Sequence, residues 1–132
     1  ILMADHGTRH IRHVDLSTPA AYHIPLILSG GALNVQDTVV TTIGSQTDMV
    51  ATVLAQLGMD HSGYKFSRNL LADQVIPFAF FSYPNGAGVV TEKGSTYFSL
   101  QSQTFVEKDS VKEDGRLLKA YLQAINEDFN RQ

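Results

Sequence analysis

An adjacent aspartate and histidine, Asp5 and His6, are the residues best suited to chemistry in this sequence. They follow the apolar run Ile1–Ala4 and precede Gly7, so they lie where a strand is expected to end. Ligands of open α/β sheets gather at the carboxyl ends of strands. A carboxylate oxygen with an imidazole nitrogen suits Mn²⁺ or Zn²⁺ better than Mg²⁺ or Ca²⁺. The pair is therefore either part of a metal site or a polar cap on a strand end.

Further polar residues of this kind are concentrated near the start of the chain. His10 and His13 are three residues apart, which fits two ligands on a helical turn or two solvated loop residues. Arg9 or Arg12 would either clamp a phosphate or sulfate oxygen or be an ordinary surface charge. His23 opens the next apolar segment, where it would contact a substrate or be a hydrogen-bonded structural residue.

Several other chemistries lack residues to support them. No Ser or Thr lies in a GxSxG motif, so no catalytic nucleophile is assigned. A GxGxxG motif and a P-loop are also missing from the sequence. The absence of cysteine excludes disulfides, thiol catalysis and Cys-zinc modules. A net charge of −3 provides no basic field for nucleic acid.

Short apolar segments must position the polar residues of the first half. Residues 1–4 and 23–29 predict two strands, the first buried on both faces as in a parallel sheet, joined by a loop over residues 7–22. Residues 38–42 fit either a strand or a loop. Ser45 and Asp48 have the spacing of a capping box, and apolar residues at helical spacing then run to Leu57, before Gly58. We therefore interpret Asp48 as structural.

The second half predicts a hairpin sheet and a closing helix. Strands are expected over residues 77–83, 88–91, 96–100 and 103–106, with turn sequences at 84–86 and 92–95. Apolar residues then recur at helical spacing from Asp114 to Phe129. The aromatic residues of the strands are expected to form a core, because no basic groove accompanies them as a nucleic-acid platform would require.

These elements predict an α/β fold in a single domain of 132 residues. Residues 1–75 would form part of a three-layer sheet, and residues 76–132 a small antiparallel sheet with its helix. Because the chain opens in an expected buried strand, we expect a fragment of a longer protein. No apolar run approaches the ~18 residues of a membrane span. The fragment is thus expected to be soluble, without membrane contact, and to self-associate through its cut sheet edge.

Three stretches in order resemble the C-terminal part of sulfatase-like enzymes of the alkaline phosphatase superfamily. They are ADHG at residues 4–7, HIPLI at 23–27, and GSQTDMVATVL at 44–54 with Leu57 and Gly58 after it. The sequence is most similar to phosphoglycerol transferases of the lipoteichoic-acid-synthase type. Residues 28–34 and the aromatic segment 78–81 resemble membrane-anchored bacterial members. The likeness covers roughly residues 1–83, and it implies an alkaline phosphatase-like fold.

The resemblance implies a metal-dependent hydrolase or transferase acting on a sulfate ester or a phosphoglycerol. In that family the Asp and His of the ADHG motif hold a catalytic metal, which implies this role for Asp5 and His6. The remaining ligands and the Thr or Ser nucleophile lie upstream, in an N-terminal half that would be this fragment's partner. Arg9 and His23 would contact substrate oxygens. The parent is expected to be anchored in the inner membrane with its catalytic domain outside the cytoplasm, and the fragment alone to be inactive.

A non-enzymatic interpretation also fits the residues. In it the chain is an α/β accessory domain, and Asp5 and His6 only cap a strand. Tight transition-metal binding by the full-length parent would favour the enzyme. No metal affinity in either the fragment or the parent would favour the accessory domain.

Overall fold

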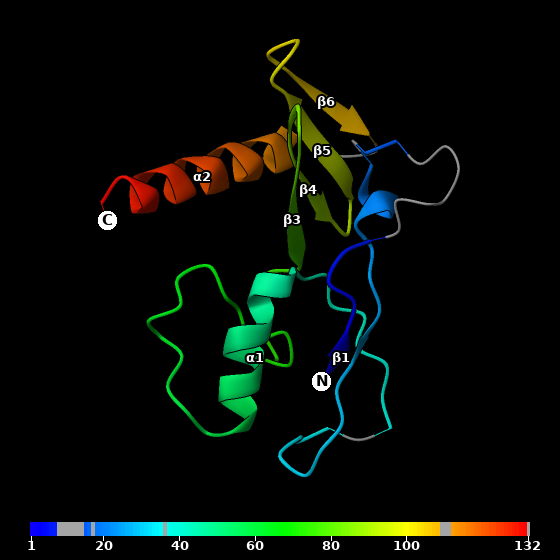
Figure 1. Cartoon of the computed structure of the whole chain (residues 1–132), viewed down its shortest axis with the longest axis vertical. Helices are drawn as coiled ribbons and strands as arrows, with labels where there is room; N and C mark the ends of the chain where they lie inside the picture. Colours follow the sequence, from blue (N-terminus) through cyan, green and yellow to red (C-terminus); the bar gives the residue numbers. More distant parts are fainter. Residues whose placement is uncertain (8–14, 17, 36, 109–111, 132) are drawn as a thin grey trace.

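The computed structural model describes residues 1–7, 15–16, 18–35, 37–108 and 112–131. Within these residues the chain is a mixed α/β fold with a two-stranded and a four-stranded antiparallel sheet and two α-helices (Figure 1). The small sheet and the first helix lie at one end of the molecule, and the larger sheet and the second helix lie at the other. Among the described residues, no helix is long and apolar enough to cross a membrane.

The small sheet pairs the two strands expected in the first half. β1 (Leu2–Met3) runs antiparallel to β2 (Leu26–Ile27), with Leu2 opposite Ile27 and Met3 opposite Leu26. The prediction of a parallel strand buried on both faces is therefore wrong, and Leu2 is 69% exposed. Strands of an all-parallel sheet are buried on both faces, whereas the side chains of β1 and β2 are exposed. Between the two strands, the described residues include the 3₁₀ turn η1 (Pro19–Ala21).

The first helix begins as the capping-box spacing predicts. Ser45 and Asp48 exchange both capping hydrogen bonds across the 3₁₀ turn η2 (Gln46–Asp48), and α1 (Met49–Gln56) continues from it. Gly58, at φ +67°, ends the helix in the left-handed conformation that glycine adopts without strain. Residues 38–42, which fitted a strand or a loop, have no regular secondary structure.

The larger sheet and its helix confirm the prediction for the second half. β3 (Phe78–Tyr83), β4 (Gly86–Thr91), β5 (Gly94–Ser99) and β6 (Thr104–Lys108) form an antiparallel meander in chain order. α2 (Lys112–Phe129) packs against β4 and β5. The buried cluster between them contains Phe78, Ala87, Val89 and Leu118.

Aromatic rings join this core to the loop that follows α1. The Tyr121 ring on α2 lies 5.7 Å from Phe66, 5.6 Å from Phe78 and 4.9 Å from Phe80, measured between centroids. Burial raises the pKa of the Tyr121 hydroxyl above its ordinary value. As expected, these aromatic side chains form core rather than an open stacking surface.

Candidate functional site

Asp5 and His6 follow β1 in a backbone conformation that two neighbours fix. The side-chain amide of Gln46 donates to the carbonyl oxygen of Asp5 and to that of the preceding residue, both at 2.9 Å. Gly7 is buried, and a Cβ atom placed on it would overlap the backbone carbonyl of Ala21. The turn after the pair therefore requires glycine. The backbone before the turn is held by Gln46, which lies in η2.

The two side chains of the pair present a nitrogen and an oxygen to each other. His6 Nδ1 lies 2.8 Å from the Gly7 carbonyl oxygen. Because a carbonyl only accepts hydrogen bonds, Nδ1 carries the hydrogen, and the neutral ring keeps a lone pair on Nε2. His6 Nε2 lies 3.6 Å from Asp5 Oδ2, and the His6 and Asp5 side chains are 65% and 88% exposed.

This arrangement fits two ligands of one transition-metal ion. Two atoms at 2.0–2.2 Å from a tetrahedral Zn²⁺ are about 3.4 Å apart, close to the observed separation of Nε2 and Oδ2. A backbone carbonyl on the other ring nitrogen is also the usual outer partner of a ligating histidine. The donor set therefore suits Zn²⁺ or Mn²⁺, and the fixed tautomer leaves the nitrogen that a metal needs.

The other oxygen of Asp5 has a local role. Asp5 Oδ1 accepts the backbone N–H of His6 at 3.0 Å. This bond satisfies a donor at the strand end, as the cap interpretation requires. Since it uses Oδ1 and the imidazole faces Oδ2, the carboxylate can cap the strand and still bind an ion.

A second Asp-His dipeptide in the chain has a different environment. Both oxygens of Asp60 accept hydrogen bonds from Ser62, one from its backbone N–H and one from its hydroxyl, each at 3.0 Å. These bonds hold the pKa of Asp60 below its ordinary value. The Asp60–His61 dipeptide therefore has both carboxylate oxygens engaged, and it serves as an internal comparison for Asp5–His6.

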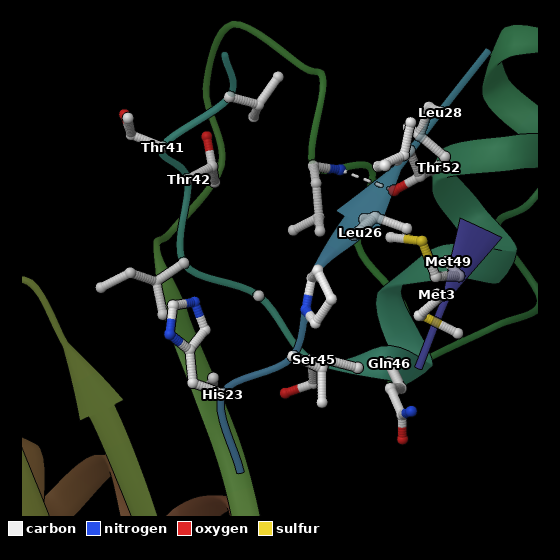
Figure 2. A pocket seen from close by; sticks show the side chains of 18 of the residues that line it. Met3, His23, Leu26, Leu28, Thr41, Thr42, Ser45, Gln46, Met49 and Thr52 are labelled. Atoms are coloured by element: carbon white, nitrogen blue, oxygen red, sulfur yellow. Dashed lines mark hydrogen bonds between the residues drawn. The ribbon is translucent and has the colours of Figure 1, made fainter. Parts of the chain in front are cut away.

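An open groove of about 1310 Å³ extends from this pair along β2 and the segment before η2. Figure 2 shows the polar side chains of His23, Thr41 and Thr42 on one side of the groove, and Leu26 and Met49 on the other. Among the described lining residues there is no lysine or arginine. The groove gives the pair a neighbouring space with one polar and one apolar wall.

The other predicted site residues divide between this groove and the masked loop. His23 is exposed in the groove, and no hydrogen bond to its imidazole is found within the described residues. Arg9, with Arg12, His10 and His13, lies outside the described residues. Of the predicted substrate contacts, the structure thus places only His23, on the groove wall.

A buried ion pair between Asp48 and Arg68 stabilises the segment next to the site, and the sequence analysis identified only one of its two residues. Asp48 is fully buried, and its carboxylate accepts three hydrogen bonds from Arg68. The donors are the backbone N–H, Nε and Nη2 of Arg68, at 2.8, 3.0 and 2.5 Å. Arg68 also donates to the carbonyls of Ile76 and Phe78, at 2.7 and 2.8 Å. The pair ties η2, which carries Gln46, to β3. The sequence identified Asp48 as structural, but nothing local marked Arg68 as its partner.

Within the described part of the chain, no group of three or more His, Cys, Asp or Glu side chains is gathered as a metal ion would need. Comparison with protein-family models, with curated proteins and with solved structures gave no match.

Proposed function

We propose that this chain is the C-terminal part of the catalytic domain of a metal-dependent hydrolase or transferase that acts on a phosphate or sulfate ester. The observation that carries the proposal is the pair of ligand atoms His6 Nε2 and Asp5 Oδ2, 3.6 Å apart, with Nδ1 of the same ring directed to a carbonyl. The resemblance of the ADHG, HIPLI and GSQTD stretches to sulfatase-like enzymes of alkaline phosphatase-like fold supports the reaction class.

In this proposal each polar residue of the site has a defined task. Asp5 and His6 hold the ion, and Gln46 fixes the backbone that carries them. His23, on the groove wall, contacts the ester, as does Arg9. A bound Mn²⁺ or Zn²⁺ would polarise the ester oxygens and lower the pKa of a hydroxyl nucleophile. The nucleophile and the remaining ligands belong to a preceding segment of a membrane-anchored parent whose catalytic domain is extracytoplasmic.

The accessory-domain interpretation keeps one specific observation in its favour. The bond from the His6 N–H to Asp5 Oδ1 is a complete strand-end cap in itself. If capping were the only role, the pair would stabilise the fold and have no affinity for a transition metal. Metal binding therefore separates the two functions directly.

The first prediction is a weak Mn²⁺ or Zn²⁺ site at Asp5 and His6. Because this pair gives two of about four ligands, we expect binding weaker than micromolar. Calorimetry would give the affinity, and broadening of imidazole NMR signals by paramagnetic Mn²⁺ would give the place. The signals of His6 should broaden, and those of His61 should not, because both oxygens of Asp60 are engaged by Ser62.

Three variants complete the test. Asp5→Ala and His6→Ala should each abolish the His6-centred binding, and His61→Ala should leave it unchanged. In the full-length parent, the same two site variants should abolish ester turnover while the protein stays folded. Unchanged metal affinity in both site variants would contradict the assignment, and lowered stability without any metal response would support the accessory domain.

A further inference from the structure

Asn85 is the one asparagine in the sequence that precedes a glycine. An asparagine carboxamide reacts with the backbone nitrogen of the next residue, and a Cβ atom on that residue hinders the approach. Glycine has no Cβ atom and allows it. The other four asparagines precede larger residues, which are Val35, Leu70, Glu127 and Arg131. The Asn85–Gly86 step is therefore the least hindered of the five.

The fold exposes Asn85 and requires a glycine after it. Asn85 and Pro84 form the two-residue turn between β3 and β4, and Asn85 is exposed. No hydrogen bond to its carboxamide is found within the described residues. A Cβ atom placed on Gly86 would overlap the carbonyl oxygen of Phe98. The unhindered neighbour of Asn85 is thus a requirement of the sheet itself.

The turn that contains Asn85 is of a kind that fits a hairpin poorly. Two-residue hairpins favour turn types I′ and II′, in which the first central residue has a positive φ. Pro84 occupies that position, and its ring fixes φ at a negative value. The φ of Asn85 is not positive either. Because such a turn does not match the twist of the strands, we expect transient separation of Gly86 from Tyr83, which releases the Gly86 nitrogen.

We propose that the Asn85–Gly86 step is a site of spontaneous deamidation, with water as the co-reactant. The Gly86 nitrogen loses its proton to hydroxide and bonds to Asn85 Cγ, the Cγ–Nδ2 bond breaks, and Nδ2 leaves as ammonia. Water then opens the resulting succinimide ring at either carbonyl carbon, which gives aspartate or isoaspartate at position 85. The reaction is independent of the metal and ester chemistry proposed for Asp5 and His6.

Isoaspartate changes this hairpin more than a simple gain of charge would. The backbone carbonyl of Asn85 accepts the N–H of Leu100 at 2.7 Å. In isoaspartate that carbonyl becomes a carboxylate outside the main chain, and the chain reaches Gly86 through Cγ with one additional carbon atom. Since Gly86 is paired with both Tyr83 and Ser99, the added atom disturbs the register on both sides of β4.

The Asp114–Gly115 step is an internal comparison for the effect of the fold. Aspartate before glycine forms the same succinimide, with loss of water in place of ammonia. Asp114, however, is 5% exposed in α2, and its Oδ2 accepts the hydroxyl of Thr91 at 3.1 Å. We therefore expect no isoaspartate at position 114 while the chain is folded.

Storage of the folded chain at mildly alkaline pH, followed by peptide mass spectrometry and enzymatic methylation of isoaspartate, tests the proposal. The peptide with residue 85 should gain the mass difference between NH₂ and OH and become methylated, while the other four asparagines stay intact. Asn85→Gln should abolish the signal, because a glutamine would have to close a six-membered ring. Asn85→Asp adds the charge without the additional backbone carbon, so it should unfold at a higher temperature than the isoaspartyl chain.

A parallel sample in urea shows the reactivity of each step without the fold. Isoaspartate at position 85 in urea but none in the folded chain would show that the turn protects Asn85, and this result would overturn the proposal. Equal deamidation at Asn34 or Asn69, or an undiminished isoaspartate signal in Asn85→Gln, would also overturn it. Isoaspartate at position 114 in urea alone would support the role given to exposure.

Discussion

Two aspartates in this chain have opposite roles because their environments differ. Asp5 is exposed and holds one oxygen towards an imidazole. Asp48 is fully buried, and its carboxylate accepts bonds from Arg68 and from the N–H of Ser45. A buried carboxylate without such partners is strongly unfavourable. Asp48 therefore stabilises the segment that carries Gln46, whereas the exposed carboxylate of Asp5 can bind a ligand.

At the residue scale, removal of the Arg68 side chain should destabilise the fold strongly. Arg68→Ala leaves Asp48 buried with two side-chain donors lost and frees the carbonyls of Ile76 and Phe78. Breaking a buried pair in this way costs about 3–5 kcal/mol. Urea denaturation followed by circular dichroism would measure the change in unfolding free energy.

Lys65→Ala is the matched control for that substitution. Lys65 forms an ion pair with Asp128 at 3.0 Å, but the Lys65 side chain is 69% exposed. Such surface pairs contribute about 0–1 kcal/mol. Equal effects of the two substitutions would contradict the importance given to the buried pair.

Residues whose role is set by close neighbours could be predicted from the sequence. The Ser45–Asp48 box was identified because both members lie within one turn, and the structure confirms it. Arg68 was missed because it lies twenty positions after Asp48, so the two residues meet only in the folded chain. The metal role of Asp5 and His6 stays a prediction. The structure adds the contact of His6 Nδ1 with the Gly7 carbonyl, which leaves Nε2 as the nitrogen that would bind a metal.

At the element scale, only the first part of the apolar stripe of α2 packs against the larger sheet. Leu118 is fully buried in the cluster with Phe78 and Val89, whereas Phe129 at the helix end is 76% exposed. The spacing placed both residues on the same stripe. The difference arises because the sheet ends before the last turns of the helix, which extend beyond it (Figure 1).

Leu118→Ala and Phe129→Ala should therefore have very different effects on stability. Leu118→Ala creates a cavity under the helix and should cost about 2–5 kcal/mol. Phe129→Ala deletes a larger side chain that is already exposed to solvent, so it should change stability by less than about 0.5 kcal/mol. Thermal and urea unfolding of both variants would measure this, and a large loss in Phe129→Ala would show that the helix end is covered in solution.

Elements with local signals were predicted better than the pairing between distant ones. The four strands of the meander follow from short turns between β-rich runs, and α2 follows from its stripe. The direction of β1 relative to β2 could not be predicted, because an apolar run of four residues fits either direction.

At the scale of the whole molecule, apolar surface is distributed unevenly between the two ends. The end that holds the larger sheet buries Phe78, Val89 and Leu118. At the other end Leu2, Ile27 and Val39 are 69%, 55% and 87% exposed. Exposed apolar groups of this kind mark contact surfaces or aggregation-prone surfaces.

We therefore predict that the chain self-associates weakly through the small sheet. Ile27→Lys places a charge on the face that Leu2 and Ile27 share, and repulsion between copies should then restore a monomer. Phe129→Lys is the control, because it places the same charge on an exposed aromatic position at the far end of α2. Sedimentation equilibrium over a range of micromolar concentrations would measure the association. An equal response to both substitutions would show that the face of Leu2 and Ile27 is not the contact. A wild-type chain that stays monomeric at every concentration would contradict the prediction, and it would show that the strand edges of β1 and β2 are covered within the molecule itself.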